Sequence, residues 1–431
     1  MSNETAGILE KSSDKPFYGW IILATGMAVA TVCFGFFYSF GVFFTDLQAD
    51  FNSTRAGIAI IASMMSLFQS LMGFLSGWAT DKYGPRLAVI VTGILFSVGL
   101  FIGSRATNLM QMYIGIGFCV GCGISVFFVY ITTLARWFIK LRGLTQGMIA
   151  AGIGIGMMIM NPISAKLLTN YGWRTSFIII AIAGVIVFSI GALIVRKNPQ
   201  EKGLQPYGMA ELSANAVYSN HIKTPVTEKD MTLQEALKTR DLWLLTGVNF
   251  SLLLTIFMVA THLVNYAKDT GMAPTSAALL MTMIGAVSIA GKVGAGSLSD
   301  KLSSRKIMLA AAIMEICLMV WLSTSMSIWM FRVFAVLHGL AYGGIAATTS
   351  VITAKTFGVT HMGKIMGISN LGVAGGGVLG PWLAGSVFDS TGSYAIAFVI
   401  AAGFCITAAV CLLFVGKHRI TANEPQQKGS S

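Results

Sequence analysis

Long apolar runs separated by short polar turns fill most of the chain. Crossing a ~30 Å hydrocarbon core as a helix takes about 20 predominantly apolar residues. Each run should form one transmembrane helix, because a helix satisfies its own backbone hydrogen bonds. The pattern therefore predicts an all-α membrane protein with twelve spans: 17–44, 56–79, 86–104, 109–135, 143–168, 175–196, 242–267, 276–299, 306–326, 328–357, 363–388 and 394–416.

One long polar segment divides the runs into two sets of six. It is rich in proline and charged residues, as linkers are. Its end, Thr232-Leu-Gln-Glu235, has the capping-box pattern and predicts a short amphipathic helix on the membrane surface. We expect five segments: an N-terminal tail over 1–16, a six-helix bundle over 17–196, the linker over 197–241, a second six-helix bundle over 242–416, and a C-terminal tail over 417–431.

Composition and charge agree with a membrane protein. The chain has 431 residues, of which 55% are hydrophobic and 11% charged, whereas soluble domains carry about 25% charged residues. The net charge is +12, yet 22 of the 29 Lys and Arg fall on one side of the predicted membrane, five on the other and two in spans. The positive-inside rule then places both termini in the cytoplasm. The excess of positive charge is explained in this way and does not indicate nucleic-acid binding. Short tails without a targeting segment favour a bacterial inner membrane, and we expect a monomer in contact with membrane lipid.

Lys292 is an ionisable residue in the apolar run 277–296. It precedes Asp300 by eight residues, which is roughly 12 Å along a helix and close to the middle of the membrane. The residue one turn earlier is Ser288, so no acid lies beside it. Because a charge at this depth is costly, we expect its partner to be an anion from outside the chain. The alternative is a structural pair with a residue on another helix.

Two short loops repeat one motif 219 residues apart, after the second and the eighth span. Both read G-x-x-x-D-K-x-x-x-R. The glycine lets two helices approach, and the acid and bases can form an ion-pair latch at a short turn. The motif residues, which we expect to act in gating, are Gly77, Asp81, Lys82 and Arg86 in the first copy and Gly296, Asp300, Lys301 and Arg305 in the second.

These loops resemble the signature of the major facilitator superfamily, and the resemblance covers essentially the whole chain. The first copy matches the full pattern of the family, and the second lacks the loop glycine. The resemblance implies two six-helix bundles that transport by alternating access. It also implies that the loop latch favours the state closed to the cytoplasm.

Three features are similar to the monocarboxylate transporter and oxalate:formate antiporter branch: residues 15–20, residues 136–152, and the base in span 8. In monocarboxylate transporters that base is usually Arg with Asp or a polar residue one turn earlier. Here Lys292 follows Ser288, so the proton mechanism of the Asp/Arg type does not transfer unchanged. The oxalate type has a second base in span 11, where this chain has none past Lys364. One central charge fits a lactate-like or pyruvate-like monoanion better than a dianion.

Other polar residues in the spans complete the candidate site. Tyr130 and Tyr342 correspond to tyrosines that line the pocket of bacterial monocarboxylate transporters, and Asn370 is a further hydrogen-bond donor. Ordinary helix packing is the alternative for all three. His262 and Glu315 are candidates for proton coupling, because histidine titrates near neutral pH and Glu315 is the only acid deep in a span. A packing histidine and a peripheral acid are the alternatives, and His338 is a second histidine of the same kind.

The sequence thus predicts a secondary active transporter of a small monocarboxylate, proton-coupled and working by alternating access. An anion exchanger of the oxalate:formate type is the first alternative, and an exporter of other organic compounds the second. A membrane sensor that binds the anion without moving it is a rival outside transport. We expect no enzyme, no cofactor and no metal site, because no nucleotide loop, metal cluster or catalytic triad stands out in the sequence. The expected partners are a small organic anion and a proton.

Overall fold

The computed structural model describes residues 17–209, 231–299, 302–324, 327–358 and 361–416. Helices make up almost all of these ranges, so the expected all-α fold is confirmed. The elements are α1 (Tyr18–Asp50), α2 (Arg55–Tyr83), α3 (Pro85–Ser104), α4 (Leu109–Met112), η1 (Tyr113–Val120), α5 (Gly121–Ile124), α6 (Val126–Trp137), α7 (Arg142–Ile194), η2 (Pro199–Lys202), α9 (Leu233–Leu237), α10 (Arg240–Asp269), α11 (Pro274–Leu298), α12 (Ser304–Ser323), α13 (Ile328–Phe357), α14 (Met362–Thr391) and α15 (Ala395–Phe414).

The twelve expected spans are all present among the described residues. Eleven helical stretches are long and apolar enough to cross a membrane, and one of them, α7, contains two spans. It turns at Gly172, whose φ of 74° and ψ of 169° are not helical, and this turn separates the fifth span from the sixth. The fourth span is assembled from α4, η1, α5 and α6, with π-helical geometry over Tyr113–Val120.

Local sequence signals explain where the helices begin. The hydroxyl of Thr54 accepts a hydrogen bond from the backbone N–H of Gly57 at 3.1 Å and caps α2. At the first motif loop, Gly84 has a φ of 88° and Pro85 starts α3, a combination that ends one helix and begins the next within a residue. The expected helix after Thr232 is also confirmed: α9 starts there with a complete capping box.

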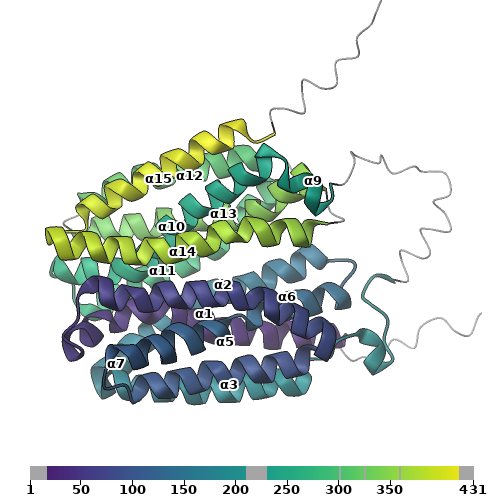
Figure 1. Cartoon of the computed structure of the whole chain (residues 1–431), viewed down its shortest axis with the longest axis horizontal. Coiled ribbons are helices and arrows are strands. Elements are labelled where there is room, and N and C mark those ends of the chain that lie inside the picture. The colour runs from purple at the N-terminus through teal and green to yellow at the C-terminus, as the bar shows by residue number, and fades with distance from the viewer. Residues whose placement is uncertain (1–16, 210–230, 300–301, 325–326, 359–360, 417–431) are drawn as a thin grey trace, which may run out of the picture.

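The spans form two bundles (Figure 1). The first six spans, purple to teal, lie in one, and the last six, green to yellow, lie in the other. The same packing recurs in both: α1 contacts the first part of α7 as α10 contacts α14, and α3 contacts the second part of α7 as α12 contacts α15. This repeat confirms the predicted architecture of two six-helix bundles.

Small residues bring helices of the two bundles together. A Cβ atom on Gly285 of α11 would lie 2.7 Å from the carbonyl oxygen of Gly154 on α7, so the two backbones are in direct contact. On the other side, α2 packs against α14: the Ser63 hydroxyl donates to the carbonyl of Val378 at 2.6 Å. Close backbone approach of this kind is how helices associate in a membrane, where water gives no hydrophobic drive.

The two ends of the molecule differ. We term the end with residues 195–209 the linker end and the end with residues 51–54 the opposite end. The helix pairs α2/α14 and α7/α11 touch in the middle. Toward the linker end, however, four of their glycines have no atom of another helix within 4 Å of the position that a Cβ atom would take. These glycines are Gly77 on α2, Gly147 on α7, Gly296 on α11 and Gly367 on α14. Each pair therefore diverges toward the linker end.

The contrast between two glycines of α11 is testable. We expect Gly285→Ala to lower the melting temperature in detergent, because its methyl group would overlap the backbone of α7, and overpacking typically costs about 1–3 kcal/mol. Gly294→Ala is the matched control: its methyl group meets open space, and alanine favours a helix by about 1 kcal/mol. Equal melting temperatures for the two variants would contradict the contact.

Candidate functional site

Lys292 lies on α11 where the two bundles meet. Its Nζ donates a hydrogen bond to the carbonyl oxygen of Ala150 on α7, in the other bundle, at 3.2 Å. The same atom lies 5.3 Å from the centre of the Tyr342 ring, over its face. Within the described part of the chain no carboxylate pairs with Lys292. The side chain is half-buried, and a carbonyl and a ring face compensate its ammonium only in part, so a bound anion would complete the compensation.

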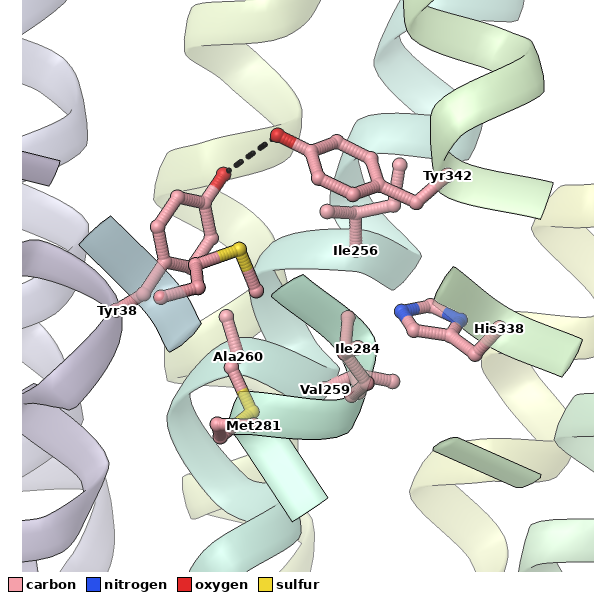
Figure 2. Close-up of a pocket in the computed structure, with 9 residues that line it drawn as sticks. Tyr38, Ile256, Val259, Ala260, Met281, Ile284, His338 and Tyr342 are labelled. Carbon is pink, nitrogen blue, oxygen red and sulfur yellow. Dashed lines mark hydrogen bonds between the residues drawn. The ribbon is translucent and has the colours of Figure 1, made fainter. Parts of the chain in front are cut away.

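Tyr342 also connects the bundles. Its hydroxyl lies 3.2 Å from the hydroxyl of Tyr38 on α1, at hydrogen-bonding distance, and both side chains are buried. Figure 2 shows the two hydroxyls pointing toward each other. Sequence reasoning missed Tyr38, which lies in a phenylalanine-rich part of the first span. Its hydroxyl in an apolar run was the one available signal.

A small cavity surrounds this tyrosine pair. The space in it that is open to a water-sized sphere is about 10 Å³, roughly what one water molecule needs. The second bundle supplies most of its walls, and apolar side chains prevail. The lining residues are Tyr38, Met157, Ile256, Val259, Ala260, Met281, Ile284, His338 and Tyr342. In this conformation the cavity therefore has room for about one water molecule, and an organic anion would have to widen it.

Glu315 and His338 form a buried pair next to this cavity. The Nδ1 atom of His338 lies 2.9 Å and 3.0 Å from the two carboxyl oxygens of Glu315. Their side chains are only 2% and 1% exposed. The sequence indicated the two residues separately. Their pairing was not predictable, because Glu315 lies on α12 and His338 on α13.

Ser288 and Asn370 are near Lys292 in sequence or depth, but neither bonds to it in the described part of the chain. The hydroxyl of Ser288 is buried and donates to the carbonyl of Gly285 in its own helix at 2.8 Å. Asn370 is half-buried on α14. Its neighbour Ser369 is the residue that bonds across helices, because it accepts a hydrogen bond from Asn249 at 2.8 Å.

Tyr130 lies inside the first bundle. Its ring packs against Gly26 of α1 and its hydroxyl against Gly191 of α7. The side chain is fully buried there. No described contact joins it to Lys292 or Tyr342, so the structure does not bring the two predicted tyrosines together.

A network of charged residues closes the opposite end. The Nη1 and Nη2 atoms of Arg55 donate to the carboxylate of Asp269 at 2.6 and 2.9 Å, and Nη1 also donates to the hydroxyl of Tyr394 at 2.7 Å. The backbone N–H groups of Arg55 and Ala56 donate to the carboxylate of Asp389 at 2.9 and 2.7 Å. Arg55 belongs to the first bundle and the other partners to the second. We term Arg55, Asp269, Asp389 and Tyr394 the opposite-end latch.

His262 belongs to this latch rather than to the cavity at Tyr342. Its Nε2 lies 2.8 Å from the carbonyl oxygen of Pro381, which can only accept, so Nε2 carries a proton. Its Nδ1 lies 3.0 Å from the hydroxyl of Tyr394. Since that hydroxyl oxygen already accepts from Arg55, it donates to Nδ1, and the chain of hydrogen bonds is complete with a neutral imidazole. Both ring nitrogens of His262 therefore take part in hydrogen bonds within the latch.

The first loop motif forms contacts inside its own bundle. Asp81 pairs with Arg136 of α6, which supports the expected ion-pair role of the acid. Lys82 lies over the ring of Tyr83, and Arg86 is exposed. The expected close approach of another helix at Gly77 is not present in this conformation, because nothing lies within 4 Å of its Cβ position.

The second loop motif is described in part. Arg305 donates to the carbonyls of Val415 and Leu413 at the end of α15, each at 2.6 Å. Gly296, like Gly77, has no neighbour within 4 Å of its Cβ position. The expected roles of Asp300 and Lys301 concern residues outside the described ranges.

Comparisons with known proteins agree with this architecture. The sequence model of the Major Facilitator Superfamily matches residues 26–266 and 244–431. Monocarboxylate transporter 13 of Rattus norvegicus is 27% identical over 400 residues, which cover 92% of this chain and 88% of the rat protein. Monocarboxylate transporter 2 of Homo sapiens is 25% identical over 433 residues, covering 96% of this chain and 89% of the human protein.

Among solved structures, a bacterial homologue of the human lysosomal transporter Spinster, in an inward-facing and occupied conformation, has a similar fold. Its TM-score is 0.72 at 16% sequence identity, and the match covers 94% of this chain and 97% of that one. At this identity the similarity concerns the fold alone.

Proposed function

Because the chain belongs to the Major Facilitator Superfamily, in its monocarboxylate transporter branch, we propose that it is a proton-coupled carrier of a small monocarboxylate of the lactate or pyruvate class. At the coarser level it is a multi-pass membrane protein and a secondary transporter. The substrate class follows the names of the curated relatives and the chemistry at Lys292.

The observation that carries the proposal is the half-buried ammonium of Lys292 without a carboxylate partner among the described residues. It contacts α7 of one bundle from α11 of the other. A carboxylate that replaced the Ala150 carbonyl as its partner would neutralise the charge where the bundles meet. Binding would then remove the cost of an unbalanced cation, so a loaded carrier would close and reopen more readily than one in which the charge of Lys292 is unbalanced.

The charge at this place also selects the substrate. The sequence of α14 contains no base past Lys364, which is exposed near the linker end. One cation neutralises one carboxylate, whereas a dianion would bring an uncompensated charge into a low-dielectric site. A monoanion therefore fits this charge best.

Alternating access would proceed between the two bundles. In the described conformation the opposite-end latch is formed and the helix pairs diverge toward the linker end. We propose that the linker end faces the cytoplasm, as the distribution of basic residues favours, so this conformation would be open inward. The curated relatives reported above come from animals; a bacterial inner membrane and a monomeric state stay predictions from the sequence.

Anion exchange of the oxalate:formate type is the second candidate, and one observation favours it. Position 288, one turn before Lys292, holds a serine whose hydroxyl bonds within its own helix. No proton acceptor therefore stands directly beside the base, and exchange requires none.

Uptake into proteoliposomes tests the proposal. We expect radiolabelled L-lactate to accumulate when the outside is acidic and the inside neutral, and to equilibrate only slowly without the proton gradient. Addition of lactate outside should make that side more alkaline, because proton and anion enter together. Uptake that ignores the proton gradient but requires a carboxylate inside would instead indicate exchange.

A further inference from the structure

The proton of such a carrier needs a binding site near the anion, and Glu315 and His338 are suited to it. They are the buried acid and base described beside the cavity, with Nδ1 within 3.0 Å of both carboxyl oxygens. Buried ionisable groups in a membrane are costly and usually functional. The contact lets a proton pass between imidazole and carboxylate without moving either side chain.

His338 gives this pair access to the transport path. It lines the same cavity as Tyr38 and Tyr342, and it lies one helical turn before Tyr342 on α13 (Figure 2). Its second ring nitrogen, Nε2, makes no hydrogen bond with a described residue. A proton arriving through the cavity would bind Nε2, and Nδ1 would release its own proton to Glu315.

Among the described residues close to the pair, the neighbouring helices supply one other charge. Lys292 of α11 lies over the ring of Tyr342, and Tyr38 of α1 bonds to the hydroxyl of that tyrosine. From α15, Cys405 lies close to Glu315 and bonds to Thr255 of α10. Lys292 is thus the cation whose charge the pair can balance. Tyr342 lies between them, because Lys292 lies over its ring and His338 lines the same cavity.

We propose that the Glu315–His338 pair is the proton-binding site that couples transport to the anion bound at Lys292. The inference rests on the proposed function and assigns its proton. Without a bound proton the pair carries one negative charge, which balances Lys292 in the empty carrier. With one proton, on either residue, the pair is neutral, and the bound monocarboxylate balances Lys292 instead. Only these two states bury no net charge, so only they exchange readily between the two ends.

The charge-neutral variant Glu315→Gln separates coupling from transport. It resembles the protonated pair permanently, so the loaded carrier remains neutral while the empty carrier keeps the uncompensated charge of Lys292. We expect lactate–lactate exchange within about twofold of the parent protein and a loss of proton-driven accumulation of at least about tenfold. Lactate addition should no longer make the outside alkaline. Glu201→Gln, on the exposed η2, is the control and should behave as the parent.

The outcomes distinguish this inference from the proposed function. If the parent protein shows no proton-driven lactate uptake, the proposed function itself fails. If the parent is coupled and Glu315→Gln is equally coupled, only the assignment of the proton site fails. A parallel loss of exchange and accumulation in folded Glu315→Gln would indicate a structural role and would also overturn the assignment. Should Glu315→Gln not yield folded protein, His338→Gln provides the same comparison, because it removes the group that connects Glu315 to the cavity.

Discussion

Replacing Lys292 by alanine is expected to abolish saturable lactate uptake. The substitution removes a cation that connects α11 to α7 in the middle of the bundle interface and has no carboxylate partner in the described part of the chain. A hydrogen bond to a charged group contributes about 1.5–3 kcal/mol, which corresponds to roughly 10- to 150-fold in affinity. By the charge balance proposed above, the empty carrier would then keep the negative charge of the Glu315–His338 pair without Lys292 to balance it, so its return should slow as well. Initial rates over a range of lactate concentrations measure both effects.

Two further variants make the test specific. Lys292→Arg keeps the charge but replaces a compact ammonium by a wider planar group, so we expect weakened uptake that remains saturable. Lys306→Ala removes an exposed charge at the start of α12 and should transport as the parent protein does. Uptake by Lys292→Ala at the rate of the parent would refute the proposed substrate site, whatever the substrate specificity of the parent.

The second large effect is expected at the opposite-end latch. Arg55→Ala removes a bidentate ion pair and two further contacts that hold the bundles together. Losing one partner of a hydrogen-bonded charge pair costs about 2–5 kcal/mol, and the lower value applies here because the Asp269 side chain is 32% exposed. A change of about 2 kcal/mol shifts a two-state equilibrium roughly 30-fold. The opposite end should therefore open in a large fraction of molecules.

Pairs of spin labels can measure this shift. Met110 and Thr275 are exposed near the opposite end of the first and second bundle, and Leu144 and Leu298 are exposed near the linker end. In Arg55→Ala we expect the first pair to move apart and the second to approach.

A matched control lies at the same end of the molecule. Arg174 pairs with Asp50, but both belong to the first bundle. Arg174→Ala should leave both distance distributions unchanged. If Arg55→Ala leaves them unchanged too, or if both variants alter them equally, the latch does not set the conformation.

Much of the fold was predictable from the sequence because each span is a local feature. The apolar runs are continuous, and their ends coincide with caps such as Thr54 and turns such as Gly84, so the helices followed from short stretches of residues. The division into two bundles followed from the polar segment at 197–241 and from the repeated loop motif. The fifth and sixth spans follow each other directly within α7, and the turn at Gly172 lies between them, inside the predicted gap from 169 to 174.

The candidate site was only partly predictable because it is made of contacts between distant residues. Lys292 stood out alone, since an ionisable residue in an apolar run is visible without a partner. Its neighbour Tyr342 was indicated by resemblance, whereas Tyr38 is 304 positions away from Tyr342 and nothing in the sequence connects them. Arg55 was counted as one of five basic residues on one side of the membrane, and its partner Asp269 is 214 positions away.

The contact between Gly154 and Gly285 determines how much movement transport requires. In the proposed alternating access this contact would be the fulcrum, that is, the point about which α7 and α11 rotate, since the two helices touch there and separate toward the linker end. From Gly154 to Gly143 the α7 lever is eleven residues long, or about 16 Å at 1.5 Å per residue, so a rotation of about 10° moves its tip by only about 3 Å. A displacement comparable to one water molecule at each lever tip would narrow the passage while the anion at Lys292, close to the fulcrum, hardly moves.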